Sequence, residues 1–324
     1  MNPNTSVLRA RRLLGLTLLA PFLLLAACGQ KHDGAESNDR RADTTHAIVL
    51  RDAHGEQLRL SAPPARVISL APNLTEMVYA LDAGPLLVGR TAYCDYPAAA
   101  AAVTIVSDIQ TPDYDRILTL RPDLVLMTFA GNSEGVYRKL KDLGIPVFAF
   151  GASTVDGVIA TIDTLGILLG RRESAARLGA DLRRRIDSIR TLARSAAEVS
   201  TFVVIDRSPL ITVSQGFIAD ALAIAGGRNI AAGSATAYPQ FSREELLRLD
   251  PEIIIYPDTR SDAVTELLKI YPEWKRLRAA RNGHIVRIQP DLVSRPGPRI
   301  ADGIELLYRT LHPVKVVDST GIRK

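Results

Sequence analysis

Residues 115–127 read DRILTLRPDLVLM, a short helix followed by a proline stop and a buried strand. The same pattern returns in residues 244–256, EELLRLDPEIIIY, which begin 129 positions later (244 − 115). Both copies open with an acid, Asp115 or Glu244, and continue with an apolar pair, a leucine, a proline, an acid and an apolar run. One helix–strand unit repeated in this way predicts a chain built from two similar halves.

Short apolar strands alternate with helical stretches on both sides of the repeated unit. Residues 46–60 alternate around a turn at 52–55 and predict a β-hairpin. Further strands are expected at RVISL (66–70), LLVG (86–89), VTIV (103–106), IPVFAF (145–150), TFVVI (201–205), LITV (210–213) and HIVRI (284–288). This alternation is typical of α/β folds in which helices cover both faces of a parallel sheet.

Residues 155–195 predict a helical region that restarts around Gly170. Its second part carries one apolar stripe, at spacings of four and three, formed by Leu178, Leu182, Ile186, Ile189 and Leu192. At 1.5 Å per residue, a helix over 172–195 spans roughly 36 Å, enough to tie two lobes together. The many arginines on this helix are most simply a solvated face.

The first 27 residues are typical of a secretion signal. Arg9, Arg11 and Arg12 precede an uncharged apolar run that is too short for a comfortable membrane span, which needs ~20 residues. The run ends in LAAC, which resembles the lipobox of bacterial lipoproteins and predicts cleavage before Cys28 and lipid on its sulfur; the alternative is an ordinary signal with a chance cysteine. Residues 28–45 are polar and aperiodic, as expected of a flexible tether.

Removal of the signal lowers the formal net charge from +5 to +2 (5 − 3), so the basic pI gives no reason to expect a nucleic-acid partner. With Cys28 lipidated, Cys94 would have no partner for a disulfide, and the fold must stand on its core.

The helix starts carry two kinds of acid. Ser242 is a good N-cap that Glu245 could close into a capping box, and Asn73 with Glu76 has the same spacing. Glu244 is then left pointing elsewhere, and Asp115 holds the equivalent position in the first copy. These two acids either complement helix N-termini or have a separate use.

Catalytic and cofactor signatures are absent from the sequence. It contains neither a glycine-rich phosphate loop nor a G-x-S-x-G elbow, and no histidine lies between residues 55 and 283. Cys94 has no histidine near it in sequence and is most simply a bystander thiol. A secreted α/β hydrolase or an iron–sulfur redox protein, the rival class, would need groups that the chain does not supply, so we expect a protein that is not an enzyme and has no cofactor.

Four loops offer residues suited to a large, partly apolar ligand. They read TAYCDYP (91–97), FAGN (129–132), SATAYPQF (234–241) and PDLVSRPGPR (290–299). Most follow expected strand ends, where open α/β sheets bind ligands. The loop side chains of interest are Tyr93, Tyr96, Tyr238, Phe241, Asp291, Arg295 and Arg299.

Six stretches together resemble the metal-chelate substrate-binding proteins of ABC importers, which capture cobalamin, ferric siderophores or haem. They read RVISLAPNLTEMVYALDAG, TAYCDYP, PDYDRILTLRPDLVLM, LKDLGIPVF, PQFSREELLRLDPEIII and SRPGPRIADGIELL. The resemblance runs from His46 to His312, and its Y-C-D-Y-P turn is most similar to the cobalamin-binding branch.

The resemblance implies two Rossmann-like lobes with central parallel sheets, joined by a single long helix, with the ligand in the cleft between them. We therefore expect a signal peptide over 1–27, a tether over 28–45, an N-terminal lobe over 46–170, a connecting helix over 171–196, a C-terminal lobe over 197–313 and a tail over 314–324. A single stiff connection implies a small closing motion. The chain is expected to act as a monomer, anchored in the bacterial cell envelope and facing the periplasm or the exterior.

Roles for single residues also follow from the resemblance. Tyr93 matches a tyrosine that packs against the corrin, Asp291 and Arg295 match a loop that touches its periphery, and Tyr238 joins them as a ligand contact. Positions that carry tryptophan in cobalamin binders are Ile109, Thr128 and Tyr238 here, whereas the only tryptophan, Trp274, is expected in a helix and in the core. Asp115 and Glu244 match the carboxylates that dock on the paired membrane subunits of the permease, which works with ATPase subunits.

The same resemblance leaves haem or a ferric siderophore as the alternative ligand. Haem would need an axial ligand, for which Tyr93 or Tyr238 is available. An anionic siderophore would favour arginines in the cleft, for which Arg90, Arg295 and Arg299 are the candidates.

Overall fold

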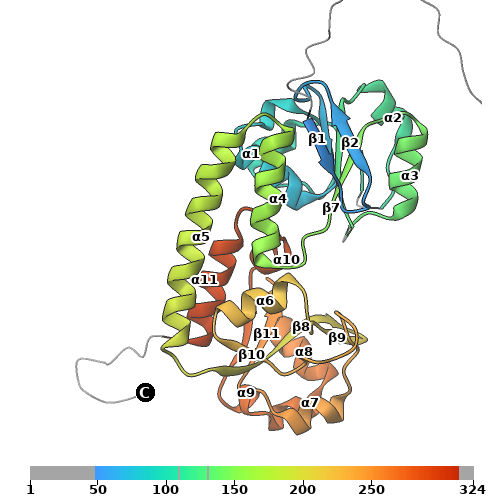
Figure 1. Ribbon diagram of the computed structural model, residues 1–324. Coiled ribbons are helices and arrows are strands. Elements are labelled where there is room, and N and C mark those ends of the chain that lie inside the picture. Colours follow the sequence, from blue (N-terminus) through green and yellow to red (C-terminus); the bar gives the residue numbers. More distant parts are fainter. Residues whose placement is uncertain (1–47, 109, 130, 314–324) are drawn as a thin grey trace, which may run out of the picture. The chain divides into compact units, whose positions relative to one another are not determined.

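A computed structural model of the chain describes residues 48–108, 110–129 and 131–313, which belong to one compact unit (Figure 1). The expected signal peptide, the lipidated Cys28, the tether, Ile109 and the tail lie outside the described residues.

The chain enters through the predicted hairpin, formed by β1 (Ile48–Arg51) and β2 (Gln57–Leu60). Asp52 holds the turn, because its Oδ1 accepts hydrogen bonds from the backbone N–H groups of His54 (2.9 Å) and Glu56 (3.0 Å). Its other oxygen accepts a hydrogen bond from the Tyr137 hydroxyl at 2.7 Å, which fastens the hairpin to α3 (Glu134–Asp142).

The N-terminal lobe, elements β1 to β7, is built on a five-stranded sheet with the order β5-β4-β3-β6-β7. All its strand pairs are parallel, as predicted. The strands are β3 (Val67–Ser69), β4 (Leu87–Thr91), β5 (Ile105–Ser107), β6 (Leu124–Thr128) and β7 (Val147–Phe150); the connections contain α1 (Pro72–Ala80), η2 (Gly84–Leu86), η3 (Ala98–Ala102), α2 (Tyr114–Thr119) and α3.

The C-terminal lobe, elements β8 to α11, has parallel strands in the order β10-β8-β11-β12. They are β8 (Val199–Arg207), β10 (Gly227–Asn229), β11 (Ile253–Pro257) and β12 (Ile285–Ile288); the remaining elements are β9 (Leu210–Thr212), α6 (Phe217–Ile224), α7 (Arg243–Leu249), α8 (Ala263–Ile270), η4 (Pro272–Arg276), α9 (Arg278–Arg281), α10 (Pro290–Ser294) and α11 (Ile300–Leu311). β9 departs from the expected parallel arrangement and pairs antiparallel with β8. Only two residues separate these strands, and a parallel pair would need a much longer crossover.

The repeated unit found in the sequence is also repeated in structure at the same offset. α2 and α7 begin 129 residues apart (243 − 114), and so do β6 and β11 (253 − 124). Asp113 caps α2 by accepting from the N–H of Arg116, and Ser242 caps α7 by accepting from the N–H of Glu245. The Glu245 side chain pairs with Arg248.

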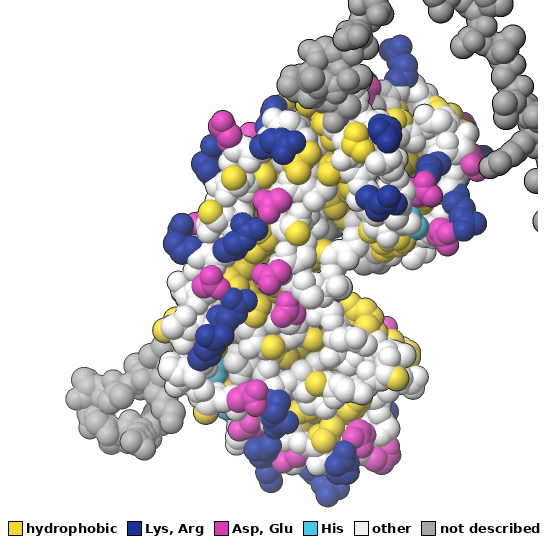
Figure 2. Space-filling view, viewed as in Figure 1, with side chains coloured by type: hydrophobic (Ala, Val, Ile, Leu, Met, Phe, Trp, Pro, Cys, Tyr) yellow, Lys and Arg dark blue, Asp and Glu magenta, His cyan; other side chains and the backbone are white. Residues whose placement is uncertain are grey.

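The predicted helical region is divided at Gly170 into α4 (Val155–Leu168) and α5 (Arg172–Arg194), which pack against each other. Gly166 permits this contact, because a Cβ there would lie 2.4 Å from the Cβ of Ala175. The predicted stripe on α5 is buried at Leu182, Ile186 and Ile189, whereas Leu192, close to the end of the helix, is 52% exposed. Arginines and acids alternate along the outer side of α5 (Figure 2), as expected of a solvated face.

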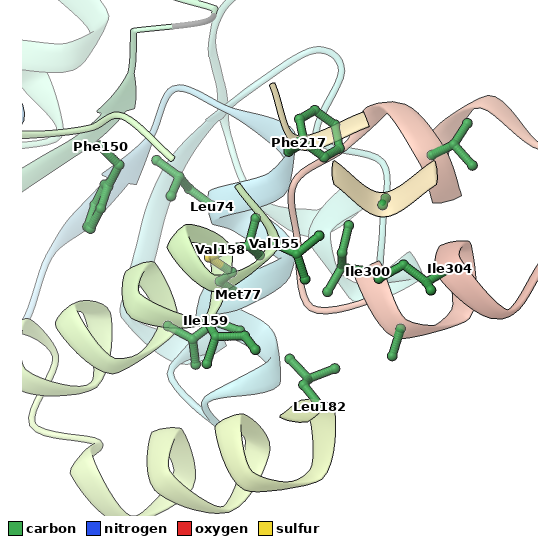
Figure 3. Packing of buried hydrophobic residues seen from close by; sticks show 14 of the residues in the cluster. Leu74, Met77, Phe150, Val155, Val158, Ile159, Leu182, Phe217, Ile300 and Ile304 are labelled. Carbon is green, nitrogen blue, oxygen red and sulfur yellow. The ribbon is translucent and has the colours of Figure 1, made fainter. Parts of the chain in front are cut away.

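One apolar core runs through both lobes. Leu74 and Met77 of α1, Val155 and Ile159 of α4, Leu182 of α5, Phe217 of α6, and Ile300 and Ile304 of α11 belong to a single cluster of buried side chains (Figure 3). The α4–α5 pair therefore joins the two sheets through packed side chains as well as through the backbone. Trp274 is fully buried in a second cluster, as predicted, although its helix is only the short 3₁₀ turn η4.

Candidate ligand-binding site

A pocket of about 420 Å³ opens at the carboxyl ends of β3, β6 and β7. The chain runs from β3 outward to β4 and β5 and then returns to place β6 on the other side of β3, so β3 and β6 form the topological switch point where open α/β sheets bind ligands. The C-terminal lobe supplies part of the wall through the end of α10. The lining residues are Leu70, Ala71, Pro72, Asn73, Thr128, Phe129, Gly131, Phe150, Gly151, Ala152, Thr161, Ser294, Arg295 and Pro296.

Phe129 is the aromatic side chain that this pocket exposes most. It is 45% exposed and follows directly on β6. The His54 ring lies behind it, 4.1 Å between centroids, and a Cβ on Gly151 would come within 3.3 Å of the Phe129 ring. The FAGN stretch pointed to this loop, but the ligand contacts expected from the sequence did not include Phe129. Its position directly after a buried strand was the available signal.

Arg295 lies on the pocket wall, as its expected role in ligand contact requires. Asp291, one helical turn earlier, is not a lining residue; its Oδ1 lies 3.2 Å from the Nε of Arg295. The two residues expected from the C-terminal loop are therefore brought together, with Asp291 holding Arg295.

Glu76 links the two lobes with a buried carboxylate, its side chain being 1% exposed. Its oxygens lie 3.1 Å from Nη1 of Arg295, and 2.6 Å and 2.8 Å from Nη2 and Nε of Arg299. The capping box expected for Asn73 and Glu76 is wrong: α1 starts after Ala71 with Pro72 in its first turn and has no side-chain cap. Asn73 also reaches the other lobe, donating from Nδ2 to the Pro296 carbonyl at 3.2 Å.

The TAYCDYP loop adds a second contact between the lobes. Asp95 Oδ1 lies 2.8 Å from Nη1 of Arg295, and the Arg299 guanidinium lies over the Tyr96 ring at 4.0 Å. Tyr93 is 55% exposed and does not line the pocket. Cys94 is buried with its sulfur 3.2 Å from the Thr91 hydroxyl.

These contacts favour the charged forms of Asp95, Arg295 and Arg299. The hydrogen bond from Arg295 lowers the pKa of Asp95 below its usual value, although burial opposes the shift. Burial opposes the charge on Arg295, but hydrogen bonds to Asp95 and Glu76 raise the pKa of that guanidinium, and hydrogen bonding to Glu76 raises the pKa of Arg299.

Tyr238 is exposed (52%) on a loop that β9 holds in place. Backbone hydrogen bonds join Thr212 to Pro239 (3.1 Å) and Ser214 to Ala237 (2.9 Å). Tyr238 does not line the pocket, whereas Thr128, another position that carries tryptophan in cobalamin binders, does.

The three arginines considered for an anionic siderophore do not form a cationic cluster. Arg90 is buried and donates to the carbonyls of Thr91 (2.9 Å) and Val103 (3.2 Å), away from the pocket lining. Arg295 and Arg299 lie together, but they are already bound by Glu76 and Asp95 of the N-terminal lobe and, at Arg295, by Asp291 of the C-terminal lobe.

Asp115 and Glu244 are both exposed, each in the first turn of its helix. Neither carboxylate is engaged by a hydrogen bond or ion pair from another of the described residues, unlike the neighbouring Asp113 and Glu245. Over these same residues, no group of histidine, cysteine and acidic side chains could hold a metal ion, and no helix is long and apolar enough to cross a membrane.

Residues 67–292 match the family model described as periplasmic binding protein. The chain belongs to this family. It is similar to the vitamin B12-binding protein of Vibrio cholerae, with 33% identity over 245 residues that cover 75% of this chain and 87% of the relative. A crystal structure of a periplasmic vitamin B12-binding protein of that organism superposes with a TM-score of 0.69 at 31% identity, covering 77% of this chain and 97% of that one.

Two further relatives extend the comparison. An uncharacterized ABC transporter substrate-binding lipoprotein of Bacillus subtilis is 28% identical over 305 residues, 91% of this chain and 95% of the relative. A periplasmic heme-binding protein of Pseudomonas aeruginosa has a TM-score of 0.70 at 27% identity, covering 78% of this chain and 94% of that one. The resemblance inferred from the sequence motifs, and the α/β fold with it, are confirmed.

Proposed function

We propose that this protein is the substrate-binding component of an ABC importer and that it captures cobalamin or a related corrinoid between its lobes. The observation that carries the proposal is the pocket at the β3–β6 switch point, lined by Phe129 from one lobe and Arg295 from the other. Its vitamin B12-binding relatives match both lobes. Capture and release need no covalent chemistry, so the proposed role is that of a binding protein, not an enzyme, without a cofactor or nucleic acid of its own.

A corrinoid is larger than the drug-sized ligands that pockets of 300–1,000 Å³ enclose. It would therefore extend from the pocket over the neighbouring exposed aromatic rings. Tyr93 and Tyr238, both more than half exposed, are the rings assigned to this outer contact, with Phe129 beneath. Asp291 would act through Arg295, whose orientation it fixes.

The remaining parts of the proposal concern delivery. Asp115 and Glu244 are assigned to docking on the paired permease subunits, because exposed and unengaged carboxylates at equivalent positions of a repeated unit suit a partner with two equivalent subunits. Cys28 is assigned to lipid attachment, which would hold a monomer at the cell envelope, outside the cytoplasm. We assign residues 46–170 and 197–313 to the two lobes and 171–196 to their connection.

Haem is the second candidate ligand, because the heme-binding relative has the same fold and the exposed phenols of Tyr93 and Tyr238 could coordinate iron.

Calorimetric titration of the purified mature protein with cyanocobalamin, haemin and a ferric siderophore panel separates these ligands. We expect cyanocobalamin to bind with a Kd below about 1 μM, a binding free energy stronger than about −8 kcal/mol. Weaker cyanocobalamin binding beside tight haemin binding would overturn the assignment.

A further inference from the structure

Three carboxylates surround Arg295 where it meets the pocket. Glu76, Asp95 and Asp291 lie 3.1, 2.8 and 3.2 Å from its guanidinium nitrogens, and the Arg295 side chain is only 17% exposed. Arg299 shares Glu76 and is 19% exposed. The cluster therefore contains three acids and two bases, a formal charge of −1 (2 − 3).

This arrangement opposes an anionic ligand in two ways. A ligand carboxylate that reached Arg295 would have to displace one of the three acids, and it would meet repulsion from the others in a partly water-excluded site. A ligand amide meets neither obstacle, because its carbonyl adds no charge and its N–H groups can donate to the accessible carboxylates of Asp95 (63% exposed) and Asp291 (32% exposed).

Metal chelates differ in the groups at their edges. The corrin of cobalamin carries uncharged amide side chains, haem carries two propionate carboxylates, and many ferric siderophores are anionic. The group at the edge of the chelate, amide or carboxylate, therefore decides how well the chelate fits the pocket wall at Arg295.

We propose that Glu76 and Asp95 are specificity determinants, which neutralise Arg295 and Arg299 so that the pocket selects chelates with amide edges over chelates with carboxylate edges. The inference rests on the proposed function and deepens it, since it names the chemical class of ligand that the site accepts. Glu76 contributes to the neutralisation of both arginines, because its buried carboxylate pairs with Arg295 and with Arg299.

Asp95→Asn is the variant that tests this most cleanly. Its side chain is 63% exposed, so the fold should tolerate the change. Calorimetry gives the Kd of haemin and of cyanocobalamin for each variant. We expect the ratio of haemin affinity to cyanocobalamin affinity to rise about threefold to tenfold. Arg295 keeps Glu76 and Asp291 but loses Asp95, so the formal charge of the cluster rises from −1 to 0 and Nη1 of Arg295 is freer to form a charge-assisted hydrogen bond with a haemin carboxylate. Raising the salt concentration should diminish this gain, because salt screens the attraction between Arg295 and a carboxylate. A gain caused by repacking alone would not depend on salt in this way.

Two further variants locate the effect. Adding Arg295→Met to Asp95→Asn should remove the gain, because the guanidinium that would bind the haemin carboxylate is then absent. Asp187→Asn on α5 is the matched control: Asp187 is 66% exposed and also pairs with an arginine, Arg190, but lies outside the pocket. It should leave the affinity ratio unchanged.

Glu76→Gln should raise the ratio further, since it removes the acidic partner of Arg299 and one of the three acidic partners of Arg295. Its thermal unfolding is measured alongside, and if it does not fold, Asp95→Asn remains decisive. An unchanged ratio in Asp95→Asn, or a gain that persists without Arg295, would overturn the inference while leaving cobalamin binding intact. A wild-type protein that binds neither cyanocobalamin nor haemin would instead contradict the proposed function.

Discussion

Phe129 is the residue through which the N-terminal lobe presents an aromatic surface to the pocket. It is a large apolar ring, and 45% of it is exposed on the wall of a pocket. The fold supports its position through His54 on the hairpin and through Gly151, which leaves room for the ring. A ligand that covered the exposed part of the ring would bury apolar surface that folding leaves in contact with water, and this burial would favour binding.

Phe129→Ala should therefore weaken ligand binding, in addition to the stability lost with the packed part of the ring. Fully covering an exposed aromatic side chain contributes about 1.5–3 kcal/mol, and only about half of the Phe129 ring remains to be covered, which predicts roughly a threefold to tenfold higher Kd for cyanocobalamin. Leu192→Ala, also a truncated and exposed apolar side chain (52%), is the control and should leave the Kd unchanged. Equal Kd values for the two variants would remove Phe129 from the binding surface.

The residues of the site could be predicted from the sequence only where their roles are local. The loop containing Arg295 was identified by its composition and position after a strand. Glu76 was assigned to a capping box because its spacing from Asn73 fits one, yet its partners lie 219 and 223 positions away. Nothing in the local pattern around Glu76 reveals ion pairs formed across two lobes.

At the level of elements, α5 contributes to the core as well as connecting the sheets. Leu182 (1% exposed) and Ile186 (2% exposed) face a cluster that includes α4, α6 and α11. Burial on one side and arginine–acid pairs on the other give this helix one orientation against both lobes.

Ile186→Ala should destabilise the protein by about 2–5 kcal/mol, the usual cost of a cavity at a fully buried aliphatic position. Because the core is continuous, denaturant unfolding followed by circular dichroism should show one transition that shifts as a whole. Leu192→Ala, on the same helix, should change the unfolding free energy by no more than about 0.5 kcal/mol. Two transitions, of which only one responds to Ile186→Ala, would show that the lobes unfold separately.

Most elements follow from sequence periodicity, since strands, helices and the α2–β6 and α7–β11 repeat are local patterns. The antiparallel direction of β9 was not predicted, because its apolar residues suit a parallel or an antiparallel strand. The two-residue connection to β8 was the feature of the sequence that required an antiparallel pair. The apolar stripe of α5 is no longer buried at Leu192. Whether a position on the stripe is buried depends on where the neighbouring helices end, and the periodicity of the sequence does not show this.

At the scale of the whole molecule, the shared core and the Glu76 contacts restrict how far the lobes can separate. We therefore expect a binding cleft that is largely formed before the ligand arrives and a transport cycle that depends on docking to the permease.

The double variant Asp115→Lys/Glu244→Lys should abolish cobalamin uptake by cells that depend on this protein, because two anionic contacts become repulsive toward a cationic docking surface. Its Kd for cyanocobalamin should equal that of the wild type, since neither residue lines the pocket. Glu134→Lys/Glu173→Lys, which reverses two other exposed first-turn acids, is the matched control and should transport normally. Normal uptake by the Asp115→Lys/Glu244→Lys variant would show that the two acids do not dock on the permease and serve only to complement the helix N-termini.

A crystal structure of the cyanocobalamin complex tests the central claim most directly. The account predicts that the corrin lies over Phe129 at the carboxyl ends of β3 and β6, that its amide groups face the cluster around Arg295, and that the lobes rotate only slightly from their unliganded arrangement. A corrinoid bound elsewhere on the molecule, or a rotation of many tens of degrees that breaks the contacts between Glu76 and the two arginines, would contradict it.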